Sequence, residues 1–320
     1  MTTILVHVET RDGVIQPIGF ELIAAARALA APLLAEVEAL VIGPVASSEV
    51  PSLGQCARVL HYEHPALGKY TPETHALALA DAVGRTSPDL VLLGYTSVGL
   101  DLGPSLAVRT GRPLVSYCTR VSVADGALEA ESQIYGGKLV GATRVRLPAI
   151  LAIVPGRYEE SLGRGTGTPP VERFADLPGL DSVGTRFLSE TRPDPGAVDL
   201  TQAERIVSVG RAIGGADGIG QAEAVAGLIG AEIAGSRPVI DAGWLPKVRQ
   251  VGKSGTRVRP KLYLALGISG APEHLEGMAA SDLIIAVNSD ANAPIFGVAH
   301  YGTTCDLFEL LPALEERLKG

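Results

Sequence analysis

The sequence contains few cysteines and no long apolar run, and both shortages exclude classes of protein. Its three cysteines, Cys56, Cys118 and Cys305, lie far apart and form no CxxC pair, which excludes a disulfide framework and a zinc or iron–sulfur site. This pattern suits a reducing cytoplasm, where we expect the protein to be located. The longest apolar run, 147–154, is far shorter than the ~20 residues of a membrane-spanning helix, so we expect no membrane span.

Positive charge and aromatic side chains are also scarce. Lysine and arginine number 27 against 35 acidic residues, which leaves a net charge of −8, and aromatic residues make up only 4% of the chain. Nucleic-acid binding needs a basic surface and rings on which bases stack. We therefore do not expect nucleic acid as a partner.

Glycine is abundant, and it lies mostly between apolar segments. The chain has 320 residues, of which 46% are hydrophobic and 38 are glycine. Segments of strand and helix character alternate in both halves, as in an α/β protein with short connections. The pattern predicts an α/β fold of two domains, each a mostly parallel sheet flanked by helices. A segment rich in proline and charge, 190–199, is the expected linker, and we place the domains at 1–192 and 193–320.

Hydrophobic periodicity and segment length give the expected elements. Helical character is expected for 19–40, 74–85, 103–110 and 220–234, with a short helix from Pro272. Strands are expected at 3–8, 39–42, 90–93, 147–154, 205–209, 238–241, 261–266 and 282–287.

Two glycine-containing turns follow strands of the second domain and are candidate ligand sites. The turn 267–270 precedes Pro272, and its N–H groups at a helix start could hold a phosphate. A tight connection without a ligand is the alternative. The turn 210–215 could present Arg211 at the carboxyl edge of the sheet, where α/β folds bind nucleotides, or it could be an ordinary connection. Neither turn has the GxGxxG spacing of a dinucleotide fingerprint.

The segment 247–261 contains six basic residues and no acid, inside a protein of negative net charge. This local reversal suggests an anionic ligand. The alternative is a solvated strand, since Arg257, Arg259 and Lys261 alternate and would share one face. The Gly-Lys-Ser triplet at 252–254 resembles the end of a phosphate-binding loop, but we reject that motif because the required glycine is replaced by lysine at position 247.

Later polar residues also have two interpretations. Asn288 and Asp306 could each cap a helix or contact a ribose. Ser269 and His274 are five residues apart and are better explained as ligand contacts than as parts of a catalytic triad. His7 lies on an apolar strand and is expected to be a core or edge residue, whereas His61, His64 and His75 lack a carboxylate or cysteine cluster that would make a metal site. We expect no metal site and no catalytic residue.

Taken in order, the motifs of the second half resemble the alpha subunit of electron transfer flavoproteins, the EtfA/FixB family. The resemblance is close over about 206–314 and looser at 94–106 and 134–156. The motifs are Gly235-Ser236-Arg237-Pro238, Gln250 to Gly255, Leu262 to Ala271, His274, Ile285 to Asp290, Ala293 to Phe296, and Asp306-Leu307-Phe308.

The resemblance implies that the second domain is a Rossmann-like FAD-binding domain, with Arg237 over the flavin ring system. It further implies that the Ser254 hydroxyl bonds flavin N5 and that His274 lies near flavin O2. Arg211 and the turn 267–271 would lie along the dinucleotide, with Asn288 and Asp306 near its adenosine end. The full set implied to bind FAD is Arg211, Ser236, Arg237, Gln250, Val251, Gly252, Lys253, Ser254, Gly267, Ile268, Ser269, Gly270, Ala271, Pro272, His274, Asn288, Asp306 and Leu307.

Some residues depart from the family pattern. Lys253-Ser254 replaces the usual Gln-Thr, so the hydroxyl is kept and a cation is added. Pro272-Glu273 replaces Ile-Gln before His274, and His300 stands where aspartate is common. Val154-Pro155-Gly156 lacks the arginine that commonly precedes Pro-Gly. These changes bear on the flavin potential, the partner and the subfamily.

The resemblance also implies a function. The chain would be an electron carrier, not itself an enzyme, that pairs through its first domain with a beta subunit. It would carry electrons from flavin dehydrogenases, such as the acyl-CoA dehydrogenases of fatty acid beta-oxidation, to a quinone-linked oxidoreductase. The alternatives are a subunit of an electron-bifurcating complex and a nucleotide-binding module without redox function.

Overall fold

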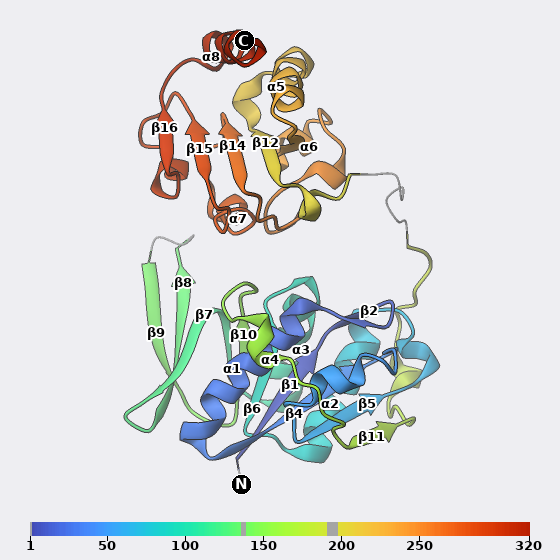
Figure 1. Cartoon of the computed structure of the whole chain (residues 1–320). Coiled ribbons are helices and arrows are strands. Elements are labelled where there is room, and N and C mark those ends of the chain that lie inside the picture. Colours follow the sequence, from blue (N-terminus) through green and yellow to red (C-terminus); the bar gives the residue numbers. More distant parts are fainter. Residues whose placement is uncertain (1, 136–138, 191–197) are drawn as a thin grey trace. The chain divides into compact units, whose positions relative to one another are not determined.

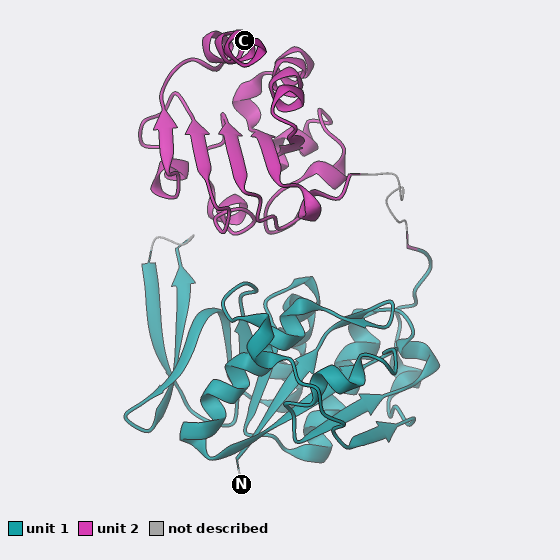
Figure 2. Cartoon of the chain, viewed as in Figure 1, with its two compact units in different colours: residues 1–189 teal, residues 190–320 magenta. Residues whose placement is uncertain are grey.

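The computed structural model describes residues 2–135, 139–190 and 198–320. The chain divides into two compact units, residues 1–189 and 190–320, which are coloured separately in Figure 2. The expected domain boundary after residue 192 and most of the expected linker, 190–199, lie outside the described residues.

Unit 1 contains a nine-stranded sheet in the order β11-β5-β4-β1-β6-β10-β7-β8-β9 (Figure 1). All neighbouring strands are parallel except the β7–β8 and β8–β9 pairs. The strands are β1 (Thr2–Val8), β4 (Ala35–Ile42), β5 (Arg58–Tyr62), β6 (Leu90–Gly94), β7 (Leu114–Ala124), β8 (Ala127–Ile134), β9 (Leu139–Val145), β10 (Ala149–Ile153) and β11 (Val171–Phe174), with a separate hairpin of β2 (Thr10–Arg11) and β3 (Val14–Ile15).

Helices cover both faces of this sheet. On one face α1 (Pro17–Leu33) packs against Ile4, Val6 and Val8 of β1, and α4 (Glu160–Gly163) packs on α1. On the other face α2 (Pro72–Thr86) and α3 (Ser97–Thr110) pack around Leu5. Successive side chains of a strand point to opposite faces, so the apolar run of β1 fills both cores.

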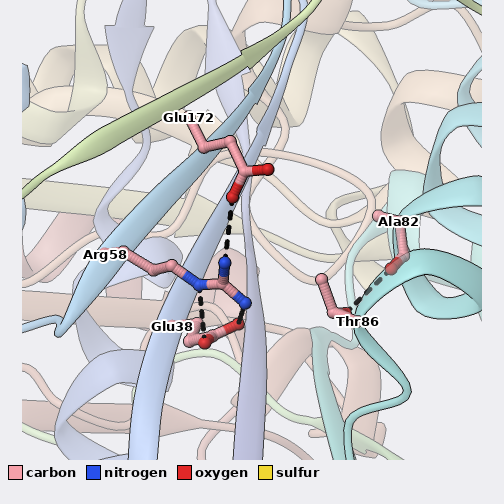
Figure 3. Close-up of polar contacts among 5 residues, drawn as sticks. All are labelled: Glu38, Arg58, Ala82, Thr86 and Glu172. Carbon is pink, nitrogen blue, oxygen red and sulfur yellow. Dashed lines mark hydrogen bonds and ion pairs between the residues drawn. The ribbon is translucent and has the colours of Figure 1, made fainter.

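A charged network joins three neighbouring strands of unit 1 (Figure 3). Arg58 donates to the buried Glu38 through Nε at 2.7 Å and to Glu172 through one Nη at 2.9 Å. The guanidinium therefore ties β5 to β4 on one side and to the edge strand β11 on the other. The same view contains Thr86, whose hydroxyl donates to the Ala82 carbonyl at 2.8 Å near the end of α2. These side chains have structural roles.

Unit 2 contains a five-stranded, fully parallel sheet in the order β13-β12-β14-β15-β16. One face is covered by α5 and α8, with Val207, Leu264 and Leu311 in their core (Figure 1). The other is covered by chain segments that bury Val251, Tyr263 and Ile295. The elements are β12 (Arg205–Val209), β13 (Glu232–Gly235), β14 (Leu262–Leu266), β15 (Ile284–Val287), β16 (Tyr301–Thr303), α5 (Ala216–Leu228), α6 (Arg237–Asp241), α7 (Pro272–Leu275) and α8 (Leu307–Lys319).

Short 3-10 helices complete the described elements. They are η1 (Val50–Leu53), η2 (Pro65–Leu67), η3 (Leu180–Ser182), η4 (Leu200–Gln202), η5 (Arg211–Ile213), η6 (Lys247–Arg249) and η7 (Pro294–Gly297).

The α/β class with two mostly parallel, helix-covered sheets is confirmed, but several element predictions are wrong. The helix expected over 19–40 ends at Leu33, because Leu34 adopts a left-handed backbone and β4 follows. The helix expected over 220–234 ends at Leu228, and its last residues form β13. The strand expected at 238–241 is α6, since Pro238 lies in the first turn, where proline favours a helix. The antiparallel β7–β9 extension was not predicted.

Within the described residues, no helix is long and apolar enough to cross a bilayer. In the same part of the chain, no three histidine, cysteine, aspartate or glutamate side chains are grouped so that they could hold a metal ion.

Candidate functional site

The predicted site residues of unit 2 follow the strand ends of one sheet. Arg211 follows β12, Ser236 and Arg237 follow β13, the turn 267–270 follows β14, and Asn288 follows β15. Parallel strands end at the same edge, and ligands of open α/β sheets bind there. Segments far apart in the sequence therefore meet at the carboxyl edge.

The turn 267–270 presents backbone donors that the rest of the described chain leaves unused. The amides of Ile268, Ser269 and Gly270 donate no hydrogen bond within the described residues. The turn is held in place because the Ser269 carbonyl accepts from the Ile295 amide at 3.1 Å. Gly270 has a φ of +81°, and a Cβ there would lie 2.3 Å from the Ile295 nitrogen. Fixed, unpaired N–H groups are suited to hold an anion such as a phosphate.

Close backbone packing at Gly210 also indicates a ligand site at this carboxyl edge. A Cβ at Gly210 would lie 2.0 Å from the carbonyl oxygen of Gly267, so the connections after β12 and β14 touch each other. Only glycine fits at this position. A ligand crossing the edge would meet backbone with no side chain in between, while the exposed Arg211 adds positive charge beside it.

Asn288 and Asp306 have different structural roles. Asn288 donates through Nδ2 to the Ile268 carbonyl at 2.9 Å, so it holds the turn and does not cap a helix. Asp306 caps α8, since its Oδ1 accepts from the Phe308 amide at 2.7 Å. The Leu307 side chain is buried in the core. Contacts of these residues with an adenosine remain a prediction.

A second part of the site joins the carboxyl edge at Gly235. The Val251 amide donates to the Gly235 carbonyl at 3.0 Å, which fixes the segment 250–255 beside Ser236 and Arg237. The Lys253 amide donates to the Glu273 carbonyl at 2.7 Å. The connections 235–237, 250–255 and 272–274 therefore converge.

Ser254 lies at the end of a chain of side-chain hydrogen bonds. Gln250, which is almost fully buried, donates from Nε2 to the Ser254 hydroxyl oxygen at 2.8 Å. Lys247 donates to Gln250 Oε1 at 2.6 Å and to the Ser254 carbonyl at 3.1 Å. Sequence reasoning placed Lys247 only in a basic segment, and the i, i+3 spacing to Gln250 was the available signal.

His274 is buried, and its partner was not predicted. Its Nε2 lies 3.0 Å from the hydroxyl of Tyr263, which is fully buried on β14. Burial lowers the pKa of His274 to about 4, and the Val251 backbone opposes this shift, so the imidazole is neutral near pH 7. Nδ1 is buried without a hydrogen-bond partner in the described part of the chain. Tyr263, a polar residue inside an apolar strand, was the sequence signal for this contact.

Within the basic segment 247–261, residues 257–261 were given the alternative interpretation of a solvated strand. That interpretation is wrong. β14 begins only at Leu262. Arg257 pairs with Glu276, and Lys261 pairs with Glu204 at 2.7 Å, so part of the positive charge is matched by acids within the unit. Arg237 is 70% exposed and pairs with Asp241 at 3.2 Å, in keeping with a cation at the surface of the site.

Comparison with known proteins agrees with this geometry. Residues 4–178 match the family model described as the electron transfer flavoprotein domain, and residues 199–279 match the one described as the electron transfer flavoprotein FAD-binding domain. The chain is 35% identical over 324 residues to the electron transfer flavoprotein subunit alpha of Thermoanaerobacterium thermosaccharolyticum, covering 99% of this chain and 97% of that protein. The chain belongs to the electron transfer flavoprotein alpha-subunit (EtfA/FixB) family.

Other family members are similar over nearly the whole chain. Protein FixB of Azorhizobium caulinodans is 35% identical over 331 residues, covering 98% of this chain and 88% of that protein. The lactate dehydrogenase (NAD(+),ferredoxin) subunit LctC of Acetobacterium woodii is 34% identical over 328 residues, covering 99% of this chain and 77% of that protein.

The residues present fit the flavin that this family carries. The unused amides of the turn 267–270 suit a phosphate, and the exposed guanidinium groups of Arg211 and Arg237 add positive charge at the same sheet edge. The matched range 199–279 contains the turn, Arg237, Ser254 and His274, whereas Asn288 and Asp306 lie beyond it.

Proposed function

We propose that the chain is the FAD-carrying alpha subunit of a heterodimeric electron transfer flavoprotein. In the cytoplasm it would accept electrons from flavin dehydrogenases, such as acyl-CoA dehydrogenases, and pass them to a quinone-linked acceptor. It acts as a carrier and performs no substrate chemistry of its own. The observation that carries this proposal is the convergence of the connections 235–237, 250–255 and 272–274 next to the turn 267–270, whose unused amides could hold an anion.

The division of labour within the site follows from its donors. The amides of 268–270 and Arg211 would hold the diphosphate, whereas Arg237, Ser254 and His274 would contact the flavin ring system. When bound, the flavin supplies the ability to take up electrons singly. The Arg237 guanidinium and an N–H of neutral His274 then favour the negative charge that reduction adds, because cations and donors stabilise anions in a site of low dielectric.

Unit 1 would serve as the surface for the beta subunit. Its edge strand β9 exposes Leu139 at 55% and Val140 at 60%, and the preceding strand exposes Ile134. An edge strand with exposed apolar side chains and unpaired backbone groups favours association with another chain. This surface supports a heterodimer whose second chain covers strands β8 and β9.

Co-purification with the beta chain tests the proposal. The complex is expected to be yellow and to contain about one FAD per alpha subunit, identified by mass spectrometry after acid release. A Ser269→Pro variant, which removes one of the unused amides, should reduce the FAD content, whereas Ser289→Ala should not. A colourless complex, or one that releases only another nucleotide, contradicts the assignment.

A second candidate function is supported by the relative LctC, whose name includes NAD(+) and ferredoxin. In a bifurcating complex, a flavin in the beta subunit would transfer one electron to the FAD of this chain. The two functions differ in the content of the purified complex. Two FAD per heterodimer support bifurcation, whereas one FAD and one AMP support the simple carrier.

A further inference from the structure

Lys247, Gln250 and Ser254 form a hydrogen-bonded series whose direction is set by chemistry. The Lys247 ammonium lies 2.6 Å from Gln250 Oε1, and Gln250 Nε2 lies 2.8 Å from the Ser254 hydroxyl oxygen. An ammonium has three donors and no acceptor, so it can bond only to the oxygen of the amide. The amide nitrogen must then face Ser254.

This orientation decides what the Ser254 hydroxyl can do. Because Gln250 Nε2 donates to it, the Ser254 oxygen is an acceptor toward the protein interior, and its own hydrogen must point elsewhere. No acceptor for that hydrogen is found among the described residues, and Ser254 is exposed. The hydrogen of the Ser254 hydroxyl is therefore free to be donated to a group outside the protein.

The surroundings keep the amide in place. Gln250 is only 1% exposed, and its backbone is paired on both sides: its carbonyl accepts from the Thr256 amide at 2.7 Å, and its amide donates to the Lys247 carbonyl at 3.1 Å. A Cβ at Gly255 would lie 2.9 Å from Gln250 Cγ, so the turn packs directly on this side chain. Without Lys247, nothing in this series distinguishes the two amide orientations.

We infer that Lys247 is a positioning residue that, through Gln250, makes the Ser254 hydroxyl a hydrogen-bond donor toward the flavin. The inference rests on the proposed function, since it needs a flavin beside Ser254. Lys247 touches no part of the ligand in this account. It acts on the flavin potential by holding one amide orientation, and a flipped amide would accept from Ser254 and turn its hydrogen inward.

The test is a double-mutant cycle on the FAD-loaded heterodimer, with the first reduction potential of the flavin as the readout. Lys247→Met should change the one-electron reduction equilibrium about threefold to tenfold, or ~30–60 mV. In a Ser254→Ala background the same change should have a much smaller effect, because only the lost charge then acts. Lys247→Arg keeps a donor and should restore most of the potential.

Lys261→Met is the matched charge control. Lys261 precedes β14 and pairs with Glu204, and it takes no part in the hydrogen-bonded series of Lys247, Gln250 and Ser254. It should leave the potential unchanged. Equal effects of Lys247→Met with and without Ser254 would overturn the inference, as would no effect at all. An NMR readout on the flavin-free protein adds independent support: the Gln250 side-chain amide should show one immobile, hydrogen-bonded proton that Lys247→Met releases. A complex without flavin refutes the proposed function. A flavin-loaded complex in which the Lys247 and Ser254 substitutions have additive effects on the potential refutes only the positioning role of Lys247.

Discussion

The two units have similar parallel sheets but differ in what occupies the carboxyl edge. In unit 1, Glu21 accepts from the Gly156 amide at 2.6 Å and from the Arg157 amide at 3.1 Å, directly after β10. Glu9 follows β1, and its carboxyl accepts from the Thr96 hydroxyl at 2.6 Å. The protein's own carboxylates thus occupy the donors that an anionic ligand would use.

In unit 2 the corresponding donors are left open. The amides of 268–270 are unused within the described residues, and Arg211 and Arg237 stand nearby. Strand order alone therefore does not leave donors open at this edge. The residues that fill the edge decide which sheet keeps unused donors.

The largest expected effect on stability and FAD binding comes from adding a side chain at the carboxyl edge of the unit 2 sheet. Gly210→Ala places a Cβ 2.0 Å from the Gly267 oxygen, so the connections after β12 and β14 must separate. We expect a loss of roughly 3 kcal/mol or more in the stability of unit 2 and a loss of FAD binding. Urea unfolding and flavin content measure both.

Gly220→Ala is the control for that substitution. A Cβ at Gly220, on helix α5, meets nothing within 4 Å, and the change should raise stability slightly. A Gly210→Ala protein with normal FAD content would show that the contact at this edge is not required.

Acid should destabilise both units. Burial lowers the pKa of His7 to about 3 and of His75 to about 4 in unit 1, and of His274 to about 4 in unit 2. Unfolded histidines take up protons below pH 6.5 while these folded ones do not, so stability falls as the pH drops from 6.5 toward 4. We expect a loss of several kcal/mol in total. Hydrogen exchange at pH 7 and 5, resolved by unit, checks this, and equal protection at both pH values would contradict it.

Glu9 should oppose that trend in unit 1 alone. Burial raises its pKa to about 7 from an ordinary 4.5, despite the bond from Thr96. Between pH 4.5 and 7 the unfolded state loses this proton while the folded state keeps it, so stability falls as the pH rises through this window and the full cost remains above pH 7. Glu9→Gln should therefore stabilise unit 1 by about 3 kcal/mol at pH 8 and by nothing at pH 4. A gain that does not depend on pH would show that ionisation is not the cause.

Arg237 gives the smallest effect and tests the open edge directly. Arg237→Ala should lower the first reduction potential of the flavin by tens of mV, since ~1.4 kcal/mol corresponds to ~59 mV and solvent screens this exposed cation. Redox titration of the heterodimer measures it, with Arg317→Ala on α8 as the remote control. An unchanged potential would remove the flavin-tuning role of Arg237.

Sequence patterns predicted the strands better than their surroundings. The strand at 205–209 is found as expected, because the segment is short and rich in β-branched residues, which favour a strand. The segment 238–241 was misassigned because a run as short as Pro-Val-Ile-Asp suits a helix as well as a strand, and the neighbouring structure decides between them. The antiparallel β8–β9 pair gave little signal, because β8 buries only alternate side chains and β9 is exposed along most of its length.

Local periodicity and the order of the motifs specify the fold class, the glycine turns and the family. Which donors remain unused depends instead on contacts in three dimensions. The Tyr263–His274 contact, the direction of the Lys247–Gln250–Ser254 series and the filling of the unit 1 edge by Glu9 and Glu21 all join residues through space. A hydrogen bond depends on distance and direction, and neither is encoded in residue type or spacing alone.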